Sequence, residues 1–244
     1  MFHLIVQLLI KKVDIEIQMY KTKIALLIPI CSRKRNYKLD NYPLKRYLLS
    51  SLDFENEYEY EIFLGSDHND LFYLKPEVKK DIDSLPNVSI RYYNDTANNP
   101  VRVWNYLFKT AYDKGFDYFY QLGDDIEIIT KNSITSFIKT LKEMNNIGVA
   151  GPLDTNNPNL LTQSFVHKTH MNIFGFYYPH EFTNWHCDNW IQEVYKPDRM
   201  KKLKEVSVRN SGGPARYQIQ GRGDYMKFVE RDKQILYNYI HGNS

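Results

Sequence analysis

Residues 116–128, FDYFYQLGDDIEI, join an apolar run of strand length to an acidic turn. The run from Phe116 to Leu122 is rich in aromatic residues, which favour strands, and Gly115 before it suits the end of a helix. The run stops at Gly123-Asp124-Asp125, and apolar residues return from Ile126 to Ile129. We therefore expect a buried strand, a turn that carries two adjacent carboxylates, and a second short strand.

Upstream of this stretch, apolar runs alternate with helical patterns. Residues 23–30, KIALLIPI, form a continuous apolar run, which is typical of a strand buried on both faces of a parallel sheet. The other predicted elements are strands at 58–67 and 88–93 and helices at 44–52 and 101–114. Pro100 suits the start of the second helix. This β-α-β alternation indicates an α/β fold with a parallel sheet.

Downstream, we expect a helix over 133–144 and a strand over 147–152, followed by an Asn- and Pro-rich loop and an aromatic region. No linker divides the chain. The sequence therefore predicts one domain over 23–244, preceded by an N-terminal extension over 1–22. The apolar run from Phe2 to Ile10 is about half of the roughly 20 residues that a membrane-spanning helix needs, so no membrane span is predicted.

The composition argues against several classes of protein. The 244 residues include 32 Lys plus Arg and 29 Asp plus Glu, without a long basic block, which disfavours a nucleic-acid partner. Cys31 and Cys187 form no CxxC pair, and His167 and His170 lack HExxH spacing, so a disulfide framework and a zinc site are not expected. Sparse cysteine favours a reducing, cytoplasmic location. The absence of GxGxxG and Walker motifs disfavours dinucleotide and P-loop chemistry.

The acidic turn predicts a metal site. Two adjacent carboxylates after a buried strand repel each other unless a positive charge lies nearby. A divalent cation supplies that charge, and oxygen ligands suit Mn²⁺ or Mg²⁺, with a diphosphate completing the coordination. Asp124 and Asp125 are the candidate ligands. The alternative is an ordinary turn, since Asp and Gly are common in turns.

Two other polar residues follow predicted strands at the same edge of the sheet, where open α/β folds bind ligands. Arg33, in the basic loop after the first strand, can neutralise phosphate, and Asp67, after the second strand, can accept hydrogen bonds from a pyrimidine ring. The alternatives are a solvated surface charge for Arg33 and a helix N-cap for Asp67.

A third candidate is Asp188, the one acid in the segment 183–191, TNWHCDNWI. Aromatic walls can shift the proton affinity of a carboxylate, and indole faces suit the apolar side of a sugar ring. The pattern predicts that Trp185 and Trp190 flank a reactive acid. The alternative is that both tryptophans belong to the core and that Asp188 caps a helix.

Taken in order, five segments resemble the GT-A nucleotide-sugar glycosyltransferases: IALLIPICSR (24–33), YEIFLGSD (60–67), FDYFYQLGDDIEI (116–128), IGVAGPLD (147–154) and FTNWHCDNWI (182–191). The similarity covers about residues 24–217. It is strongest to family 2-like members, in a branch seen in protists and large DNA viruses. It implies the GT-A fold, with one Rossmann-like mixed sheet flanked by helices. It also implies viral glycosylation, which would place a viral protein in the host cytoplasm.

The resemblance also assigns roles to residues. Gly123-Asp124-Asp125 stands in for the DxD motif, with Asp125 the direct metal ligand and Asp124 nearer the ribose or the metal shell. Gly123 departs from the family, since many relatives carry an acid there, and this leaves fewer ligands for the metal. The remaining assignments are a nucleotide pocket lined by Pro29, Ser32 and Arg33, Asp67 on the base, Asp188 as the catalytic base, Arg216 on phosphate, and Asn210 as a third metal ligand.

The function that these observations predict is a metal-dependent transfer of a hexose or N-acetylhexosamine. The donor is a nucleotide diphosphate sugar, most often UDP-linked in this fold, and the acceptor is a hydroxyl of a glycan, protein or lipid. Asp188 removes the acceptor proton and the transfer inverts the anomeric carbon. The alternatives are a catalytically silent nucleotide-sugar or glycan-binding protein and a sugar nucleotidyltransferase, although no glycine-rich phosphate loop follows the first strand. No oligomeric state is predicted.

Overall fold

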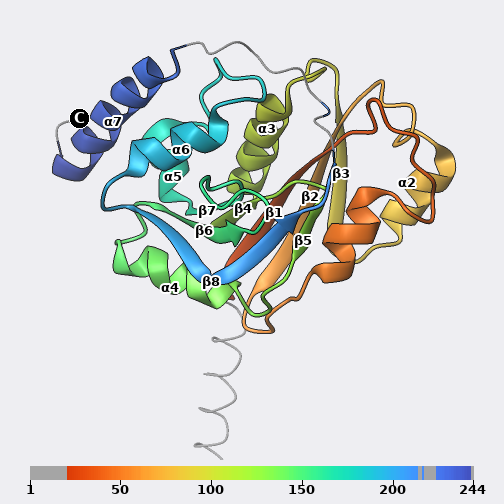
Figure 1. Ribbon diagram of the computed structural model, residues 1–244, viewed down its shortest axis with the longest axis horizontal. Helices are drawn as coiled ribbons and strands as arrows, with labels where there is room; N and C mark the ends of the chain where they lie inside the picture. Colours follow the sequence, from red (N-terminus) through yellow and green to blue (C-terminus); the bar gives the residue numbers. More distant parts are fainter. Residues whose placement is uncertain (1–20, 214–215, 217–223, 243–244) are drawn as a thin grey trace, which may run out of the picture.

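The computed structural model describes residues 21–213, 216 and 224–242. Helices flank a central sheet, with α7 beside α5 and α6 at one end (Figure 1). The elements in chain order are β1 (Lys23–Ile30), η1 (Leu44–Leu49), β2 (Glu59–Asp67), α2 (Pro76–Asp83), β3 (Val88–Tyr93), α3 (Pro100–Asp113), β4 (Tyr118–Gln121), β5 (Ile126–Ile128), α4 (Ile134–Glu143), β6 (Val149–Asp154), β7 (Ser164–His167), α5 (Thr169–Phe174), α6 (Cys187–Tyr195), β8 (Met200–Asn210) and α7 (Met226–His241).

The described strands form one mixed sheet in the order β3-β2-β1-β4-β7-β6-β8-β5. The strands β3, β2, β1 and β4 are parallel, as expected from the alternation of strands and helices. The strand β7 runs antiparallel to both β4 and β6, and β5 runs antiparallel to β8. The sheet is therefore parallel in its first half and mixed in its second half.

Each face of the sheet has its own core. In β1, Leu26 and Ile28 point to the face that η1, α2 and α4 cover, whereas Ala25 and Leu27 point to the face that α3, α5 and α6 cover. Successive side chains of a strand point to opposite faces, so a strand buried on both sides is apolar throughout. This explains the continuous apolar run at 23–30, whose residues from Ile24 to Ile30 are all buried.

Most predicted elements are present, with small shifts of their ends. The strand β3 has the predicted bounds, and α3 and α4 each differ by one residue at either end. The helix expected at 44–52 is a short π-helix, η1. The strand expected at 147–152 begins at Val149 instead, because Ile147 still belongs to the turn that follows α4, where its N–H donates to the carbonyl of Met144. The elements α2, β7, α5, β8 and α7 were not predicted, and α6 was expected only in the alternative in which Asp188 caps a helix.

Two predictions about the ends of the chain stay predictions. Residues 1–20, most of the expected extension, lie outside the described residues, as do residues 214–215 and 217–223 on either side of Arg216, which was expected on phosphate. No helix in the described part of the chain is long and apolar enough to cross a membrane.

Candidate functional site

The candidate site lies where the order of the strands reverses. From β1 the chain moves outward to β2 and β3, and it then returns to form β4 on the other side of β1. Loops that follow β1 and β4 therefore meet at the carboxyl edge of the sheet, which is the usual ligand site of open α/β folds. The first of these loops carries Ser32 and Arg33, and the second carries Asp124 and Asp125.

The acidic turn after β4 holds a buried ion pair. Asp124 is fully buried and Asp125 is nearly so. The guanidinium of Arg216 contacts both oxygens of Asp124, and its Nη2 donates to Oδ2 of Asp125 at 2.9 Å. Nη1 of Arg216 also donates to the carbonyl of Cys31 at 3.0 Å, which links the turn to the end of β1. One cation thus neutralises two adjacent carboxylates.

Two glycines make room for the carboxylate of Asp125. A Cβ on Gly212 would lie 1.7 Å from Oδ2 of Asp125, and a Cβ on Gly123 would lie 2.8 Å from its Oδ1. Gly123 therefore leaves space that the Asp125 carboxylate occupies. Burial raises the pKa of Asp125 to about 6, the negative charge of Asp124 adds to the rise, and Arg216 opposes it.

Gln163, which the sequence did not single out, fixes the start of the turn. It lies just before β7, is buried, and accepts a hydrogen bond from the N–H of Gly123 through its Oε1 at 3.2 Å. The backbone of the turn is also held from the other side, because the N–H of Ser211 donates to the carbonyl of Asp125 at 2.9 Å. The turn is thus anchored on two sides by its own chain.

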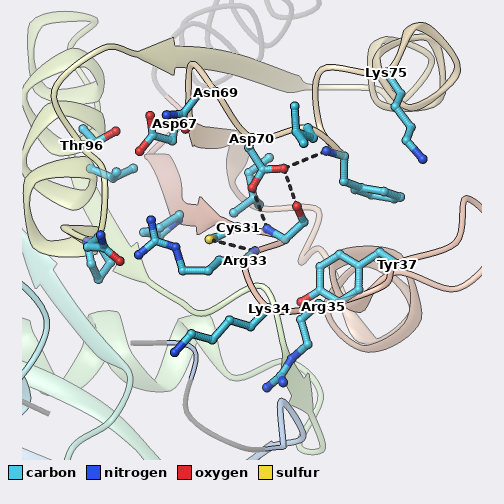
Figure 2. Close-up of a pocket in the computed structure, with 18 of the residues that line it drawn as sticks. Cys31, Arg33, Lys34, Arg35, Tyr37, Asp67, Asn69, Asp70, Lys75 and Thr96 are labelled. Atoms are coloured by element: carbon cyan, nitrogen blue, oxygen red, sulfur yellow. Dashed lines mark hydrogen bonds between the residues drawn. The ribbon is translucent and has the colours of Figure 1, made fainter. Parts of the chain in front are cut away.

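A cavity of about 580 Å³, here named the Arg33 cavity, opens beside the loop after β1. Pro29, Ser32, Arg33 and Asp67, four of the six predicted nucleotide-binding residues, line it. Figure 2 shows Asp67, Asn69 and Thr96 on one side of this cavity and Arg33, Lys34, Arg35 and Tyr37 on the other. The wall of this cavity therefore carries several positively charged side chains, and Lys75 is one more of them.

Asp70, which was not predicted from the sequence, shapes this loop. Its buried carboxylate accepts hydrogen bonds from the N–H of Ser32 at 2.7 Å and from the hydroxyl of Ser32 at 2.6 Å. It also accepts hydrogen bonds from the N–H groups of Phe72 and Tyr73. Asp70 thus joins the loop after β1 to the loop after β2, and it holds Ser32 in place.

A second cavity, of about 370 Å³, adjoins the first and is here named the Asp188 cavity. Pro29 and Pro100 line both cavities. The residues of the Asp188 cavity that were predicted from sequence are Asp124, Asp125, Asp188, Asn210 and Arg216. The structure therefore brings every residue that was assigned a catalytic, nucleotide-binding or metal-binding role to two neighbouring cavities, although these residues come from segments far apart in the chain.

Asp188 lies in the first turn of α6 and is only partly exposed. Burial raises its pKa to about 7, while a weak hydrogen bond from the thiol of Cys187 acts in the opposite direction. The negative charge of Asp154 adds to the rise. A carboxyl group with a pKa near neutrality can both accept and hold a proton at physiological pH.

Of the two tryptophans predicted to flank Asp188, Trp185 lines the cavity and Trp190 does not. Trp185 is 38% exposed and lines the Asp188 cavity, as expected. Trp190 is fully buried, and its indole N–H donates to Asp232 at 2.9 Å, so it belongs to the core. The second indole of the cavity is Trp104, on α3. No local motif marks Trp104, because only the fold brings α3 to this loop.

Asn210 ends β8 and pairs with Ile126 of β5, which places it next to the acidic turn. Its side-chain oxygen accepts a hydrogen bond from the N–H of Gly212 at 3.2 Å. The histidines at 167–186 were not expected to form a zinc site, and this stays a prediction. His170 is fully buried against the hydroxyl of Tyr195, and no group of three or more acidic, His or Cys side chains suited to a metal occurs among the described residues.

Solved structures share this fold. The crystal structure of S. aureus TarS 1-349 in complex with UDP matches with a TM-score of 0.58 at 13% sequence identity, covering 89% of this chain and 66% of that chain. The complex of TarS 1-349 with UDP-GlcNAc matches with a TM-score of 0.60 at 12% identity, covering 89% and 67%. A longer TarS chain matches with a TM-score of 0.55 at 12% identity, covering 90% of this chain and 43% of that chain. No protein-family model and no curated protein sequence matches.

The likeness to TarS confirms the predicted fold class, an α/β protein of the GT-A type with one mixed sheet flanked by helices. At 12–13% identity the likeness concerns the fold alone. The present chain spans about two thirds of TarS 1-349 and less than half of the longer TarS chain.

Proposed function

We propose that this chain is a metal-dependent glycosyltransferase that moves a hexose or N-acetylhexosamine from a UDP-linked donor to a hydroxyl acceptor. The proposal rests on three features that lie at two adjoining cavities. They are a basic loop, a turn with two adjacent acids, and a carboxyl group, that of Asp188, whose pKa is about 7. The fold shared with TarS, which has been crystallised with UDP and with UDP-GlcNAc, supports a UDP-linked donor.

In this proposal the nucleoside lies in the Arg33 cavity. Asp67 accepts a hydrogen bond from the uracil ring, and Arg33 neutralises phosphate. The buried hydroxyl of Thr96, on the same side of the cavity as Asp67, has no hydrogen-bond partner among the described residues. A buried polar group without a partner costs roughly 1–3 kcal/mol, and a pyrimidine can supply the missing hydrogen bond.

The metal, Mn²⁺ or Mg²⁺, belongs to the acidic turn in this proposal. The fit rests on two carboxylates that share one positive partner, the Arg216 guanidinium, at the wall of the Asp188 cavity. Asp125 and Asn210, with oxygens of the diphosphate, would hold the cation, and Asp124 would keep Arg216 in place. A bound metal neutralises charge on the departing diphosphate. Arg216, which also lines the cavity, adds positive charge near that group.

The transfer step uses Asp188 as the base. The acceptor oxygen forms a bond to the anomeric carbon while the bond from that carbon to the diphosphate oxygen breaks, and UDP leaves with the electron pair. The hydroxyl proton passes to a carboxylate oxygen of Asp188. A single displacement of this kind inverts the configuration at the anomeric carbon.

Two other functions fit parts of the site. A silent binding protein would keep the cavities and lose turnover, and the missing acid at Gly123 is the one feature that favours it. A nucleotidyltransferase would instead join UTP to a sugar 1-phosphate and release pyrophosphate. It would need a glycine-rich phosphate loop after β1, where this chain has Cys31-Ser32-Arg33.

The test is calorimetric binding of UDP, with hydrolysis of UDP-sugars measured in parallel, each with and without Mn²⁺. We expect Mn²⁺-dependent binding, slow hydrolysis of one donor sugar and no pyrophosphate release. Arg33→Ala should weaken UDP binding, whereas Arg46→Ala, an exposed arginine on η1, should not. Binding without hydrolysis of any UDP-sugar would favour the silent protein, and release of pyrophosphate from UTP would favour the nucleotidyltransferase.

A further inference from the structure

A third cavity, of about 540 Å³, continues the Asp188 cavity and is here named the Asp154 cavity. The two share four lining residues, so they form one groove: Asn157, Thr162, Asn210 and Gly213. Asp188 is not among the described residues that line the Asp154 cavity, and none of these residues lines the Arg33 cavity. The Asp154 cavity is thus placed to hold the part of an acceptor that lies behind its reacting hydroxyl.

The wall of the Asp154 cavity consists of hydrogen-bonding groups without positive charge. None of the described residues that line it is Lys, Arg or His. The lining side chains are three amides and two hydroxyls, together with one acid: Asn156, Asn157, Asn210, Thr162, Ser211 and Asp154. Amides and hydroxyls both donate and accept hydrogen bonds, which suits a ligand covered with neutral hydroxyl groups.

The buried carboxylate of Asp154 holds two residues of this wall in place. It is fully buried and accepts hydrogen bonds from the hydroxyl of Thr162 and the N–H of Asn156, each at 2.9 Å. Its negative charge reaches Asp188, whose pKa it helps to raise. The Asp154 cavity, with two nearby acids and no cation among its described lining residues, disfavours an anionic ligand. The Arg33 cavity, with Arg33 and three other cations, has the opposite character.

The groove is held in shape by its own contacts. Nδ2 of Asn156 donates to the carbonyl of Asn210 at 2.6 Å, which ties the loop after β6 to the end of β8. Nζ of Lys202 donates to the carbonyl of Pro158 at 2.7 Å, on the same loop. A groove that is already formed costs little ordering energy when a ligand enters.

An exposed indole completes the groove. Trp185, 38% exposed, lines the Asp188 cavity together with Asn157, which also lines the Asp154 cavity. The face of an indole packs against the apolar face of a pyranose, while amides bind its hydroxyls. An aromatic platform beside neutral amides fits a carbohydrate better than a peptide or a lipid chain.

We propose that the acceptor is a neutral oligosaccharide of at least two sugar units. The unit with the reacting hydroxyl lies in the Asp188 cavity against Trp185, and the next unit lies in the Asp154 cavity among the amides of Asn156 and Asn157. This inference rests on the proposed function and narrows its acceptor from any hydroxyl compound to one chemical class.

The test compares acceptors with the full-length protein, its preferred UDP-sugar and Mn²⁺. The panel contains neutral monosaccharides, the matching di- and trisaccharides, the same oligosaccharides carrying a carboxylate or phosphate, and a serine-rich peptide. The readout is glycosylated product, detected by mass spectrometry. We expect kcat/KM to rise by about 10-fold from mono- to disaccharide, as one or two added neutral hydrogen bonds would give, and to fall for the anionic analogues.

A matched pair of variants locates the second unit. Asn156→Ala should remove most of the gain from mono- to disaccharide, and Asn159→Ala, an exposed asparagine of the same loop that lines neither cavity, should keep it. Hydrolysis of the UDP-sugar distinguishes a failure of the acceptor inference from a failure of the proposed function. If UDP-sugar is hydrolysed but the peptide or an anionic oligosaccharide is the better acceptor, the inference is overturned and the proposed function stands. If UDP does not bind and no UDP-sugar is hydrolysed, both are overturned.

Discussion

Nη2 of Arg216 donates to Oδ2 of Asp125 at 2.9 Å, across 91 residues of sequence. The same guanidinium contacts both oxygens of the fully buried Asp124. Two neighbouring carboxylates can be buried here because one delocalised cation lies between the turn and the end of β1. In the proposed function a divalent metal would meet part of the same requirement for positive charge, with Asp125 as its ligand, while Asp124 would keep Arg216 in place.

The first prediction concerns Arg216→Ala. Removing one partner of a buried ion pair leaves uncompensated charge, which typically costs roughly 3–5 kcal/mol, so the Tm should fall. Mn²⁺ should then raise the Tm of the variant by more than it raises that of the wild type, since the cation replaces the lost charge. Arg209→Ala is the control, because Arg209 pairs with Glu127 at the surface. Equal Mn²⁺ shifts in Arg216→Ala and wild type would contradict this reasoning.

The second prediction is that Asp125→Ala abolishes Mn²⁺-dependent binding of UDP and leaves the protein folded. Asp125 has the more exposed side chain of the pair, at 13% against none for Asp124. Calorimetric titration of UDP with Mn²⁺ gives the affinity, and circular dichroism checks the fold. Asp113→Ala, in a surface pair with Lys109, is the control. Undiminished affinity in a folded variant would rule out Asp125 as a metal ligand.

The third prediction tests the space around Asp125 without removing its charge. In Gly212→Ala the new Cβ would lie 1.7 Å from Oδ2 of Asp125, so the carboxylate must move. A displacement of about 1 Å can cost about 100-fold in rate, and we expect a loss of that order in kcat/KM for donor hydrolysis. Ser211→Ala, at the preceding position, should change donor hydrolysis little. Normal kinetics of Gly212→Ala would mean that the position of the Asp125 carboxylate does not matter.

The strands in the first half of the sheet were predictable from local patterns: β1 is apolar throughout because both its faces are covered, whereas the edge strand β3 begins with alternating apolar and polar residues. The run at 23–30 and the strand at 88–93 were both found from local pattern alone. The strand β8 was missed, since MKKLKEVSVRN carries four Lys or Arg residues and buries only Leu203, Val206 and Val208. Its place between β6 and β5 depends on pairing with strands far away in the sequence, which no local period reveals.

The residues of the candidate site also fall into those that local sequence predicted and those that only the structure revealed. Residues that directly follow a buried strand, such as Arg33 and Asp125, were found from the rule that ligands bind at the carboxyl edge of the sheet. Gln163 and Trp104 were not found, because their roles arise from tertiary contacts with the acidic turn and with the Asp188 cavity. Trp190 was misassigned to the cavity, since its helical position relative to Asp188 places it in the core.

The fourth prediction concerns stability and pH. The pKa of Asp188 in the folded protein, about 7, lies above that of an ordinary aspartate, so the folded state binds this proton more tightly than the unfolded state does. The contribution of Asp188 to stability is therefore largest at low pH and is lost as the pH rises toward 7. Asp188→Asn should have a Tm close to that of the wild type at pH 4 and a higher Tm at pH 8. A difference in Tm that does not change with pH would contradict the raised pKa.

The last prediction is that Asp188 is the general base of an inverting transfer. Asp188→Asn keeps the size of the side chain and removes the proton acceptor, so kcat should fall by about 10²- to 10⁴-fold while UDP binding survives. In the wild type, kcat/KM should rise with pH with a midpoint near 7, because only the ionised carboxyl group accepts the proton. Glu193→Gln, on the same helix and paired with Lys196, is the control. Product NMR should show an anomeric configuration opposite to that of the donor; retained configuration, or full activity of Asp188→Asn, would exclude this mechanism.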